Sequence, residues 1–491
     1  MNGEYPDETS LESPPLLVKA SLMKFVIYDT LSKQNQTVEP ADGKVLGFYC
    51  CGPTVYAAAH IGNFRTFVVQ DVFRRVAELS GLTVKHVRNV TNVDDKTIRV
   101  SMEQGQKLEA FTKRWTTKFH QDCEALHLLT PEVEPGAVEH ISEQIELIER
   151  LMDKNVAYQT ADGSIFFRIE SFPEYGRLSG VKDRELTTDT GAQADDEYGR
   201  DSMADFALWK SAKPEDGENV WDSPWGKGRP GWHLECSAMS MKYLGPSFDV
   251  HSGGIDLTFP HHENEIAQSE ACTGKTFSRL WFHVVHLMVD GKKMSKSLGN
   301  MYTLEDLQAK GFEAAEIRYG LIAGHYRKHL NFTVGALDAH RSNLQRLSRL
   351  SQLVNTTVGY KPNSYVECCK LPLNLEDLGR FSSAFAALLE NLNVPKALGE
   401  VFRVAGEMEK DPATITQADA LGLERVVYAL GLRLPEQKVA EIPEEIHALA
   451  EERLKARSDK NWGESDRLRD KLKNKGWTVK DVAGGYELEK A

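Results

Sequence analysis

The sequence lacks the features that mark membrane-spanning and secreted proteins. No apolar run among its 491 residues approaches the roughly 18 residues that a transmembrane helix needs, and we expect no membrane partner. The first 22 residues hold four acidic residues and one lysine, so a basic start followed by an apolar core is missing. We therefore expect residues 1–22 to be a frayed tail, with Met23 as a candidate functional start.

Cysteine is scarce, and its spacing does not fit a disulfide framework. The chain has seven cysteines, an odd number, and none of them forms a Cys-x-x-Cys pair. Internal repeats and low-complexity tracts are also missing. This pattern predicts a reduced, cytoplasmic protein.

An excess of positive charge is missing as well. The chain holds 59 Lys and Arg against 72 Asp and Glu, a net charge of −13, which excludes a protein that coats nucleic acid. A local basic surface remains compatible with this balance. Apolar residues at 41% and charged residues at 27% are typical of a globular protein, and the length predicts about three domains.

The order of apolar patterns predicts an α/β fold. A buried strand is expected at residues 45–50, a helix where apolar residues recur every three or four positions from Phe64 to Leu79, and a strand at 83–90. Strand, helix and strand in this order form the unit of a parallel sheet. The pattern resumes at residues 248–251, with a helix after Pro260 and a strand around 283–289.

The remaining patterns divide into an insertion and a helical second half. A helix at 138–151 and a hairpin at 156–169 precede residues 170–230, which are rich in Gly, Pro, Asp and Trp and read as an insertion. Strand signals nearly vanish beyond Asn300, and a helical region runs to about Leu432. Residues 451–480 hold ten Lys and Arg and six Asp and Glu, so they form a locally basic segment.

The tetrapeptide His60-Ile61-Gly62-Asn63 lies between the first strand and the first helix. A helix N-terminus offers unpaired N–H groups and a positive dipole end, which bind phosphate. Gly62 would let the backbone approach a ligand, and His60 could donate a hydrogen bond to a phosphate oxygen. Taken alone, these four residues fit a capped helix with an incidental histidine better.

The pentapeptide Lys293-Met294-Ser295-Lys296-Ser297 forms a second motif, bracketed by Gly291 and Gly299. Two ammonium groups on such a loop could close over a polyphosphate and neutralise charge on the α-phosphate and the leaving pyrophosphate. A solvated surface loop explains the same residues equally well.

A third set, Cys51, Cys236, His261 and Glu265, has the chemistry of a zinc site. Thiolate, imidazole and carboxylate all bind Zn²⁺, and His261 and Glu265 share one face of the predicted helix. The spacing is a weak signal, however. From the residues alone, buried apolar cysteines with His262 or Glu265 at the surface are the simpler interpretation.

Longer blocks carry a family resemblance. The two phosphate motifs together resemble the paired signatures of class I aminoacyl-tRNA synthetases. The segments at residues 49–56, 88–96, 228–239 and 259–267 resemble those of cysteinyl-tRNA synthetases, and the likeness runs in order from about Met23 to Asn331.

This resemblance implies roles for individual residues. Asn63 replaces the second histidine of the general signature but can still donate a hydrogen bond, and Ser252 stands where the family usually has glycine. The implied roles are one zinc held by Cys51, Cys236, His261 and Glu265; cysteine bound by Thr91 and Trp232; phosphate charge stabilised by His60, Asn63, Lys293 and Lys296; and ATP, with Mg²⁺, contacted by His60, Gly62, Asn63, Gly254, Asp256 and Lys296.

The resemblance also implies the reaction and its partners. L-Cysteine and ATP would form cysteinyl-adenylate, and the cysteine would pass to the terminal adenosine of tRNA(Cys), in a monomer or a homodimer. Zinc would select cysteine over serine by binding the thiolate. Trp462, Arg467 and Trp477 in the basic segment are candidate tRNA contacts, although core tryptophans are the alternative.

Three other functions remain open. A cysteine ligase of the mycothiol pathway would share the catalytic half but use an amino-sugar acceptor, and it would lack the roughly 160 residues that follow here. A zinc hydrolase would leave the lysine loop unexplained, and the chain has no His-Glu-x-x-His motif. A non-catalytic tRNA-binding relative would be expected to lose His60 or Lys296.

The expected fold is α/β, a Rossmann-like parallel-sheet catalytic domain with an insertion, followed by a mainly α-helical tRNA-binding region and a small C-terminal α/β segment. The expected domains are a tail (1–22), a catalytic domain in two halves (23–120 and 231–300), an insertion (121–230), a stem-contact region (301–350), an anticodon-binding bundle (351–440) and a C-terminal tRNA-binding segment (441–491).

Overall fold

The computed structural model describes residues 23–181, 204–295, 298–371, 373–436, 443–482 and 485–490. The chain divides into two units, residues 1–434 and 435–491, which we describe separately. No helix among the described residues is both long enough and apolar enough to cross a lipid bilayer. The finer domain boundaries expected from the sequence stay predictions.

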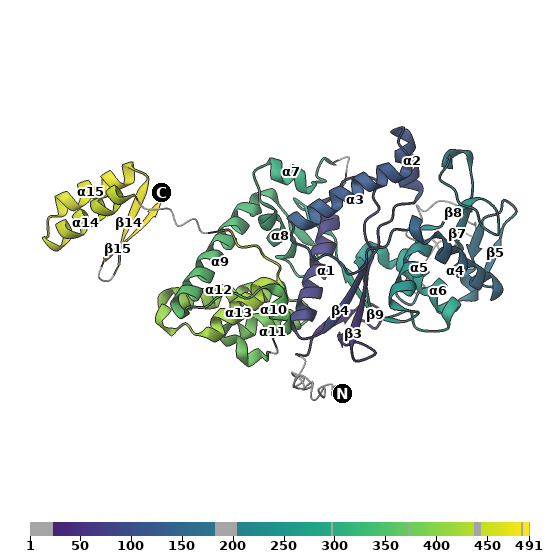
Figure 1. Ribbon diagram of the computed structural model, residues 1–491, viewed down its shortest axis with the longest axis horizontal. Coiled ribbons are helices and arrows are strands. Elements are labelled where there is room, and N and C mark those ends of the chain that lie inside the picture. Colours follow the sequence, from purple (N-terminus) through teal and green to yellow (C-terminus); the bar gives the residue numbers. More distant parts are fainter. Residues whose placement is uncertain are drawn as a thin grey trace, which may run out of the picture. The chain divides into compact units, whose positions relative to one another are not determined.

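A four-stranded parallel sheet organises the first unit (Figure 1). Its order is β10-β9-β3-β4, and every neighbouring pair is parallel. The four strands are β3 (Val45–Cys50), β4 (Thr83–Arg88), β9 (Phe248–Gly254) and β10 (Ser278–Val284). This sheet confirms the predicted α/β class.

Helix α1 (Ile61–Leu79) connects β3 to β4 and packs against the sheet. Its apolar residues, spaced as the sequence predicted, place Phe73 between Phe48 of β3 and Phe282 of β10, with ring centroids 4.7 and 5.4 Å away. Phe25, directly before the N-terminal hairpin of β1 (Val26–Asp29) and β2 (Gln34–Thr37), joins the same core. The start of α1 is thereby fixed relative to the carboxyl ends of the strands.

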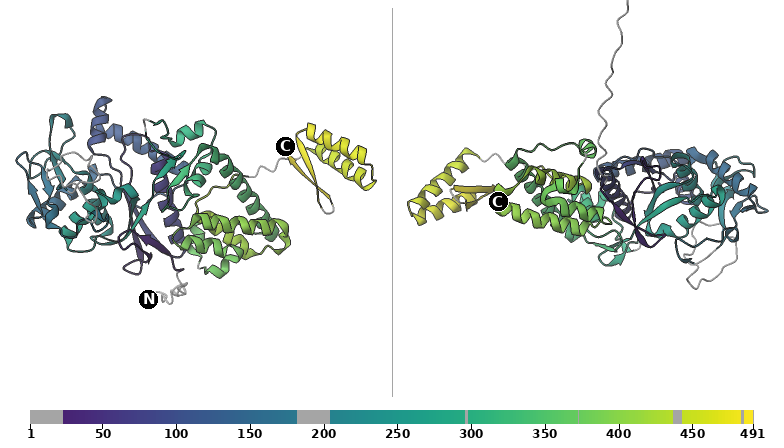
Figure 2. Two further views of the ribbon diagram at one scale, coloured as in Figure 1. Left: turned by 180° about the vertical axis from the view of Figure 1, so that it is seen from behind. Right: turned by 90° about the horizontal axis from the view of Figure 1, so that it is seen from below.

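The insertion forms a sheet of its own on one side of the first unit (Figures 1 and 2). The expected hairpin is present, and two further antiparallel strands extend it from the stretch rich in Gly, Pro and Trp. The elements from β4 onward are α2 (Asp95–Glu103), α3 (Leu108–Ala125), α4 (Ile141–Asp153), β5 (Ala157–Gln159), β6 (Ile165–Phe167), β7 (Phe206–Ser211), β8 (Gly228–Pro230), α5 (Trp232–Leu244) and α6 (His261–Thr273).

A short mixed sheet and a helical region complete the first unit. The expected strand at 283–289 is divided between the end of β10 and β11, and the three-residue β13 is a strand that the sequence pattern did not predict. Buried Asp71 of α1 joins this region to the sheet domain by its ion pair with Arg318 of α8, and it also pairs with Arg75 of its own helix. The elements are β11 (Leu287–Val289), β12 (Lys292–Lys293), α7 (Leu304–Ala309), α8 (Ala314–Ile322), β13 (Leu330–Phe332), α9 (Leu337–Val358), α10 (Tyr365–Lys370), α11 (Ser382–Leu389), α12 (Val394–Lys410) and α13 (Gln417–Ala429).

The second unit is a helix pair with an antiparallel hairpin. It consists of α14 (Glu444–Ser458), α15 (Trp462–Asn474), β14 (Trp477–Val482) and β15 (Gly485–Lys490). Leu468 and Leu472, whose helical spacing is visible in the sequence, pack with Trp477 in its core. The unit therefore has an apolar core of its own, as the expected small C-terminal α/β segment requires.

Candidate functional site

A cavity of about 950 Å³ opens at the carboxyl ends of the parallel strands. Residues that follow β3, β4, β9 and β10 all line it, which is where open α/β sheets bind their ligands. It brings together most of the residues singled out from the sequence: Cys51, His60, Gly62, Asn63, Thr91, Trp232, Cys236, Gly254, Asp256, His261 and Lys293.

The first phosphate motif forms a reciprocal cap at the N-terminus of α1. His60 Nδ1 accepts the backbone N–H of Asn63 at 3.2 Å, and Asn63 Oδ1 accepts the backbone N–H of His60 at 3.1 Å. Because Nδ1 is an acceptor here, neutral His60 carries its proton on Nε2. Burial lowers the pKa of His60, despite the charge of Asp256, so the ring is neutral at pH 7.

The cap leaves two donors for a ligand in the cavity. These are the Nε2–H of His60 and the side-chain amide of Asn63, whose oxygen is used by the cap. These residues thus form the helix cap that the simpler interpretation predicts, and they also keep two donors for a ligand.

The second phosphate motif approaches the first one at Gly62. A Cβ atom on Gly62 would lie 3.2 Å from Met294 Sδ and 2.9 Å from His60 Nδ1, so a larger residue would force the two segments apart. The backbone of Ile61 also donates to Tyr302 O at 2.9 Å. Lys293 lines the cavity, whereas Lys296 lies outside the described residues.

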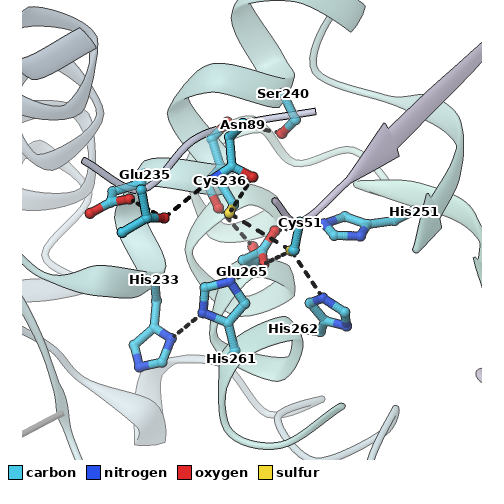
Figure 3. A network of polar contacts seen from close by, with 12 residues as sticks. Cys51, Asn89, His233, Glu235, Cys236, Ser240, His251, His261, His262 and Glu265 are labelled. Atoms are coloured by element: carbon cyan, nitrogen blue, oxygen red, sulfur yellow. Dashed lines mark hydrogen bonds and ion pairs between the residues drawn. The ribbon is translucent and has the colours of Figure 1, made fainter. Parts of the chain in front are cut away.

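The four expected metal ligands form a compact cluster, and Cys51, Cys236 and His261 of this cluster line the cavity (Figure 3). The ligand atoms of Cys51, Cys236, His261 and Glu265 all lie within 4.8 Å of one another, and all four residues are buried. The two sulfur atoms are 3.8 Å apart, and His261 Nε2 lies 3.0 Å from Glu265 Oε1. Two thiols, an imidazole and a carboxylate are a donor set that fits zinc.

Charges within the cluster are set by burial and by close pairing. A hydrogen bond with Cys51 lowers the pKa of Cys236 to about 6, while burial raises the pKa of Cys51. Burial opposes the charged forms of His261 and Glu265, but their pairing raises the pKa of His261 to about 10 and, with His251, lowers that of Glu265 to about 2. The anionic Cys236 and Glu265 are thus paired with a protonated His261 in a buried site, and a metal cation would take the place of the protons on His261 and Cys51, because these groups bind metals in their deprotonated forms.

Histidines around the cluster hold its ligands in place. His233 Nδ1 lies 2.9 Å from His261 Nδ1, and His251 Nε2 lies 2.8 Å from Glu265 Oε2. These contacts orient the imidazole and carboxylate, as partners of metal ligands commonly do. Neither histidine was assigned from the sequence, because His233 lies in α5 and His251 in β9, and their contacts depend on how these elements pack against α6.

An overlapping set, Cys51, His251, His262 and Glu265, is equally compact. His262 Nε2 lies 3.3 Å from Cys51 Sγ, but its Nδ1 pairs with His283 at 2.8 Å. Neither His251 nor His262 lines the cavity, whereas Cys51, Cys236 and His261 do. Of the two sets, the first has three members that line the cavity, whereas Cys51 is the one such member of the second.

The two residues expected to contact cysteine border this cluster. The Trp232 ring stacks on His261 with centroids 4.3 Å apart. Thr91 donates to buried Glu235 at 3.0 Å and accepts a hydrogen bond from Asn89 at 3.2 Å. Glu235 and Asn89 were not among the residues expected from the sequence; Asn89 also supports the turn after β3 by accepting from Gly52.

Ser252 does not reach the cavity. Its side chain is fully buried and accepts a hydrogen bond from Gln70 of α1 at 3.0 Å. Gly254, two residues later, lines the cavity beside Asp256. A serine in place of the usual glycine therefore leaves the backbone approach at Gly254 open.

The expected tRNA contacts of the second unit differ in exposure. Trp462 is 58% exposed, with the guanidinium of Arg457 5.6 Å from its ring centroid, and Arg467 is exposed beside Glu464. Trp477 is only 5% exposed and packs in the core. The expectation for Trp477 is corrected accordingly, because its ring cannot stack on a base while the core is closed.

A parallel sheet whose strand ends carry the helix start at His60–Asn63 and the loop with Lys293 is the architecture expected of a class I aminoacyl-tRNA synthetase. Residues 37–342 match the family described as tRNA synthetases class I (C) catalytic domain, and residues 439–487 match the cysteinyl-tRNA ligase anticodon binding domain. The chain belongs to the cysteine–tRNA ligase family.

Relatives across nearly the whole length agree with this assignment. The chain is 48% identical to the cysteine–tRNA ligase of Opitutus terrae, over 96% of this chain and 100% of that protein. It is 43% identical to that of Chlamydia muridarum, over 95% and 100%, and 42% identical to that of Protochlamydia amoebophila, over 94% and 97%.

Solved structures show the same fold at low sequence identity. A ternary LeuRS–tRNA–LeuAMS complex from Agrobacterium radiobacter matches with a TM-score of 0.58 at 12% identity, over 79% of this chain and 84% of that one. Mycobacterium tuberculosis methionyl-tRNA synthetase with methionyl-adenylate matches with a TM-score of 0.56 at 14% identity, over 79% and 89%.

Proposed function

We propose that this cysteine–tRNA ligase activates L-cysteine with ATP and Mg²⁺ and transfers it to the terminal adenosine of tRNA(Cys). The cysteine carboxylate attacks the α-phosphate, and pyrophosphate leaves. A ribose hydroxyl of the tRNA then takes the acyl group and AMP leaves. The observation that carries the proposal is the single cavity, which is lined both by the helix start at His60–Asn63 and by Cys51, Cys236 and His261 of the metal cluster.

The residues of the helix start and of the lysine loop stabilise phosphate charge. His60 donates through Nε2 and Asn63 through its amide, while Lys293 and Lys296 supply two positive charges from the loop. Gly62, Gly254 and Asp256 line the path of the nucleotide. This part of the chemistry needs no covalent nucleophile, because positioning and charge stabilisation are sufficient.

We infer that Cys51, Cys236, His261 and Glu265 hold one zinc ion and that this ion selects the substrate. When bound, zinc offers a soft Lewis-acid site that favours the thiolate of cysteine over the hydroxyl of serine. An apolar pocket alone discriminates such small differences by only about 1–3 kcal/mol. Thr91 and Trp232 then hold the rest of the amino acid beside the cluster.

The match of residues 439–487 to an anticodon binding domain supports tRNA over an amino sugar as the acceptor. We propose Trp462 and Arg467 as RNA contacts in that unit and keep monomer or homodimer as the expected assembly. All seven cysteines are free thiols, which suits the cytoplasm that we propose as its location.

Cysteine-dependent exchange between ATP and pyrophosphate, followed by charging of tRNA(Cys), tests the proposal. We expect exchange without tRNA, and Lys296→Ala should slow it by about 100-fold or more, as loss of one charge-stabilising donor does. Lys275→Ala, an exposed lysine outside the cavity, is the control. Acylation of an amino sugar instead of tRNA would favour the ligase alternative.

A further inference from the structure

Part of the cavity lining belongs neither to the phosphate motifs nor to the metal cluster. We call this part the α2–α3 lobe; it is formed from α2 and the residue before it, and from α3, by Asp94, Asp95, Lys96, Arg99, Trp115 and Phe119. These helices directly follow β4 in the chain. The cavity, of about 950 Å³, is at the upper end of the usual size range of ligand pockets.

The order of the sheet separates this lobe from the expected nucleotide path. Gly254 and Asp256 follow β9, whereas the α2–α3 lobe follows β4, and β3 lies between these two strands. Cys51, at the end of β3, therefore lies between the two regions along the sheet order.

The lobe combines an aromatic ring with positive charge. Trp115 lines it, and the buried indole N–H of Trp115 has no acceptor within the described residues. Lys96 is exposed, and Arg99 reaches only a distant contact with Glu103, 3.9 Å away, with both side chains about two-thirds exposed. Aromatic faces stack on unpaired bases, and cations pair with nucleic-acid phosphates.

The two carboxylates of the lobe are already committed to the protein. Asp94 caps α2, accepting the backbone N–H of Thr97 at 2.6 Å. Asp95 is bound by Lys210 of β7 at 2.7 Å and by Arg229 of β8, and both cations are more than nine-tenths buried. The insertion thus holds α2 in place, and its two cations balance the charge of Asp95. Lys96 and Arg99 are therefore available to bind an anion.

We propose that the α2–α3 lobe binds the 3′-terminal adenosine of the tRNA, with its base stacked on Trp115 and its 5′-phosphate held by Lys96 and Arg99. The proposal rests on the proposed function, because it names where the acceptor of that same reaction binds. Trp115 and the two cations bind the acceptor end and take no part in forming the adenylate.

The first test compares exchange with charging in Trp115→Ala and Lys96→Ala. We expect the ratio of the exchange rate to the single-turnover transfer rate from preformed adenylate to rise about tenfold in each variant. Trp115→Phe should restore transfer, since it keeps an aromatic face. Lys113→Ala, on the same helix and outside the cavity, should behave as the wild type. Parallel losses of exchange and transfer would overturn the proposal.

The second test measures competition by two uncharged tRNAs, one ending in a 3′-deoxyadenosine and one lacking the terminal adenosine. The wild type should bind the first about tenfold more tightly, and Trp115→Ala should bind both alike. Unchanged discrimination in Trp115→Ala overturns the lobe assignment. A wild type that exchanges pyrophosphate yet charges no tRNA refutes the proposed function itself, so the two failures are distinguishable.

Discussion

Cys51 and Cys236 are 185 positions apart in the chain, yet their sulfur atoms lie 3.8 Å from each other. Spacing could not reveal this, because none of the ligands forms a Cys-x-x-Cys pair and the contact depends on how β3 and α5 pack. Only His261 and Glu265, on one helix face, carried a local signal. Comparison with a known family was therefore needed to predict the set.

The choice between the two overlapping clusters can be tested by metal analysis. Cys236→Ser and His261→Ala should lose zinc and the preference for cysteine over serine, whereas His262→Ala should keep both. His251→Gln should lower zinc affinity by about 10–100-fold, because it removes the partner that holds Glu265.

Cys369→Ser is the matched control for this series, because Cys369 belongs to neither cluster. The measurement is bound zinc per chain after dialysis, together with exchange rates for cysteine and serine. Full zinc in Cys236→Ser with none in His262→Ala would assign the metal to the other set.

At the scale of elements, the N-terminus of α1 has a structural and a chemical task that substitutions can separate. His60→Asn should keep the cap, because asparagine is among the best N-cap residues, but it removes the Nε2–H donor. His60→Ala removes both. We expect exchange to fall by about 100–1,000-fold in each variant, and unfolding free energy to fall by about 1 kcal/mol in His60→Ala only.

Exchange kinetics and urea unfolding of the two variants check this prediction. Wild-type exchange in His60→Asn would show that the imidazole serves the helix cap alone. That outcome would favour the interpretation of the motif as a capped helix with an incidental histidine.

The junction between α1 and α8 gives a pH dependence of stability. Burial opposes ionisation of Asp71, but Arg75 and Arg318 hold its pKa well below the usual range. A carboxyl with a depressed folded-state pKa stabilises the protein fully above its unfolded pKa of about 3.9, and this contribution is lost as the pH falls below that value. Asp71→Asn should cost about 3–5 kcal/mol at pH 7, since it leaves buried charge unpaired.

Urea unfolding at pH 7, 5 and 3.5 measures this effect. The difference between wild type and Asp71→Asn should be equal at pH 7 and 5 and smaller at pH 3.5. Arg403→Ala, which breaks surface pairs with Glu400 and Glu407, should change stability little at any pH. A difference that grows toward low pH would contradict the assignment.

The sequence predicted the central strands and the first helix better than the short strands of the other sheets. The strand–helix–strand pattern and the period of α1 predicted the parallel sheet, because buried strands and amphipathic helices leave a local trace in sequence. The strands β7, β8 and β13 left little trace, since Gly, Pro and Trp interrupt the first two and β13 has three residues. Their pairing depends on tertiary contacts rather than on local pattern.

At the scale of the whole molecule, net charge and local charge have separate consequences. The chain is acidic overall, yet residues 451–480 are basic, and this segment lies within the second unit. The sequence predicted this contrast but could not tell core tryptophans from exposed ones. Trp477 begins β14 and faces the core, whereas Trp462 begins α15 and stays exposed, a difference that only the packing of the unit decides.

The last prediction concerns a chain that ends at Leu434, where the first unit ends. Every residue of the cavity lies before that point, so cysteine-dependent exchange should stay within about twofold of the full chain. Charging should show a raised KM for tRNA more than a lowered kcat, because the acceptor end still reaches the cavity. Loss of the basic segment removes phosphate contacts, so the salt dependence of the KM should flatten.

In the full chain, Trp462→Ala should raise the KM for tRNA by about 5- to 150-fold, which corresponds to a lost stacking contact of about 1–3 kcal/mol. Lys410→Ala in the first unit is the control. Steady-state charging at 50 and 200 mM salt decides the matter: an unchanged KM in the truncated chain would mean that residues 435–491 do not bind the tRNA.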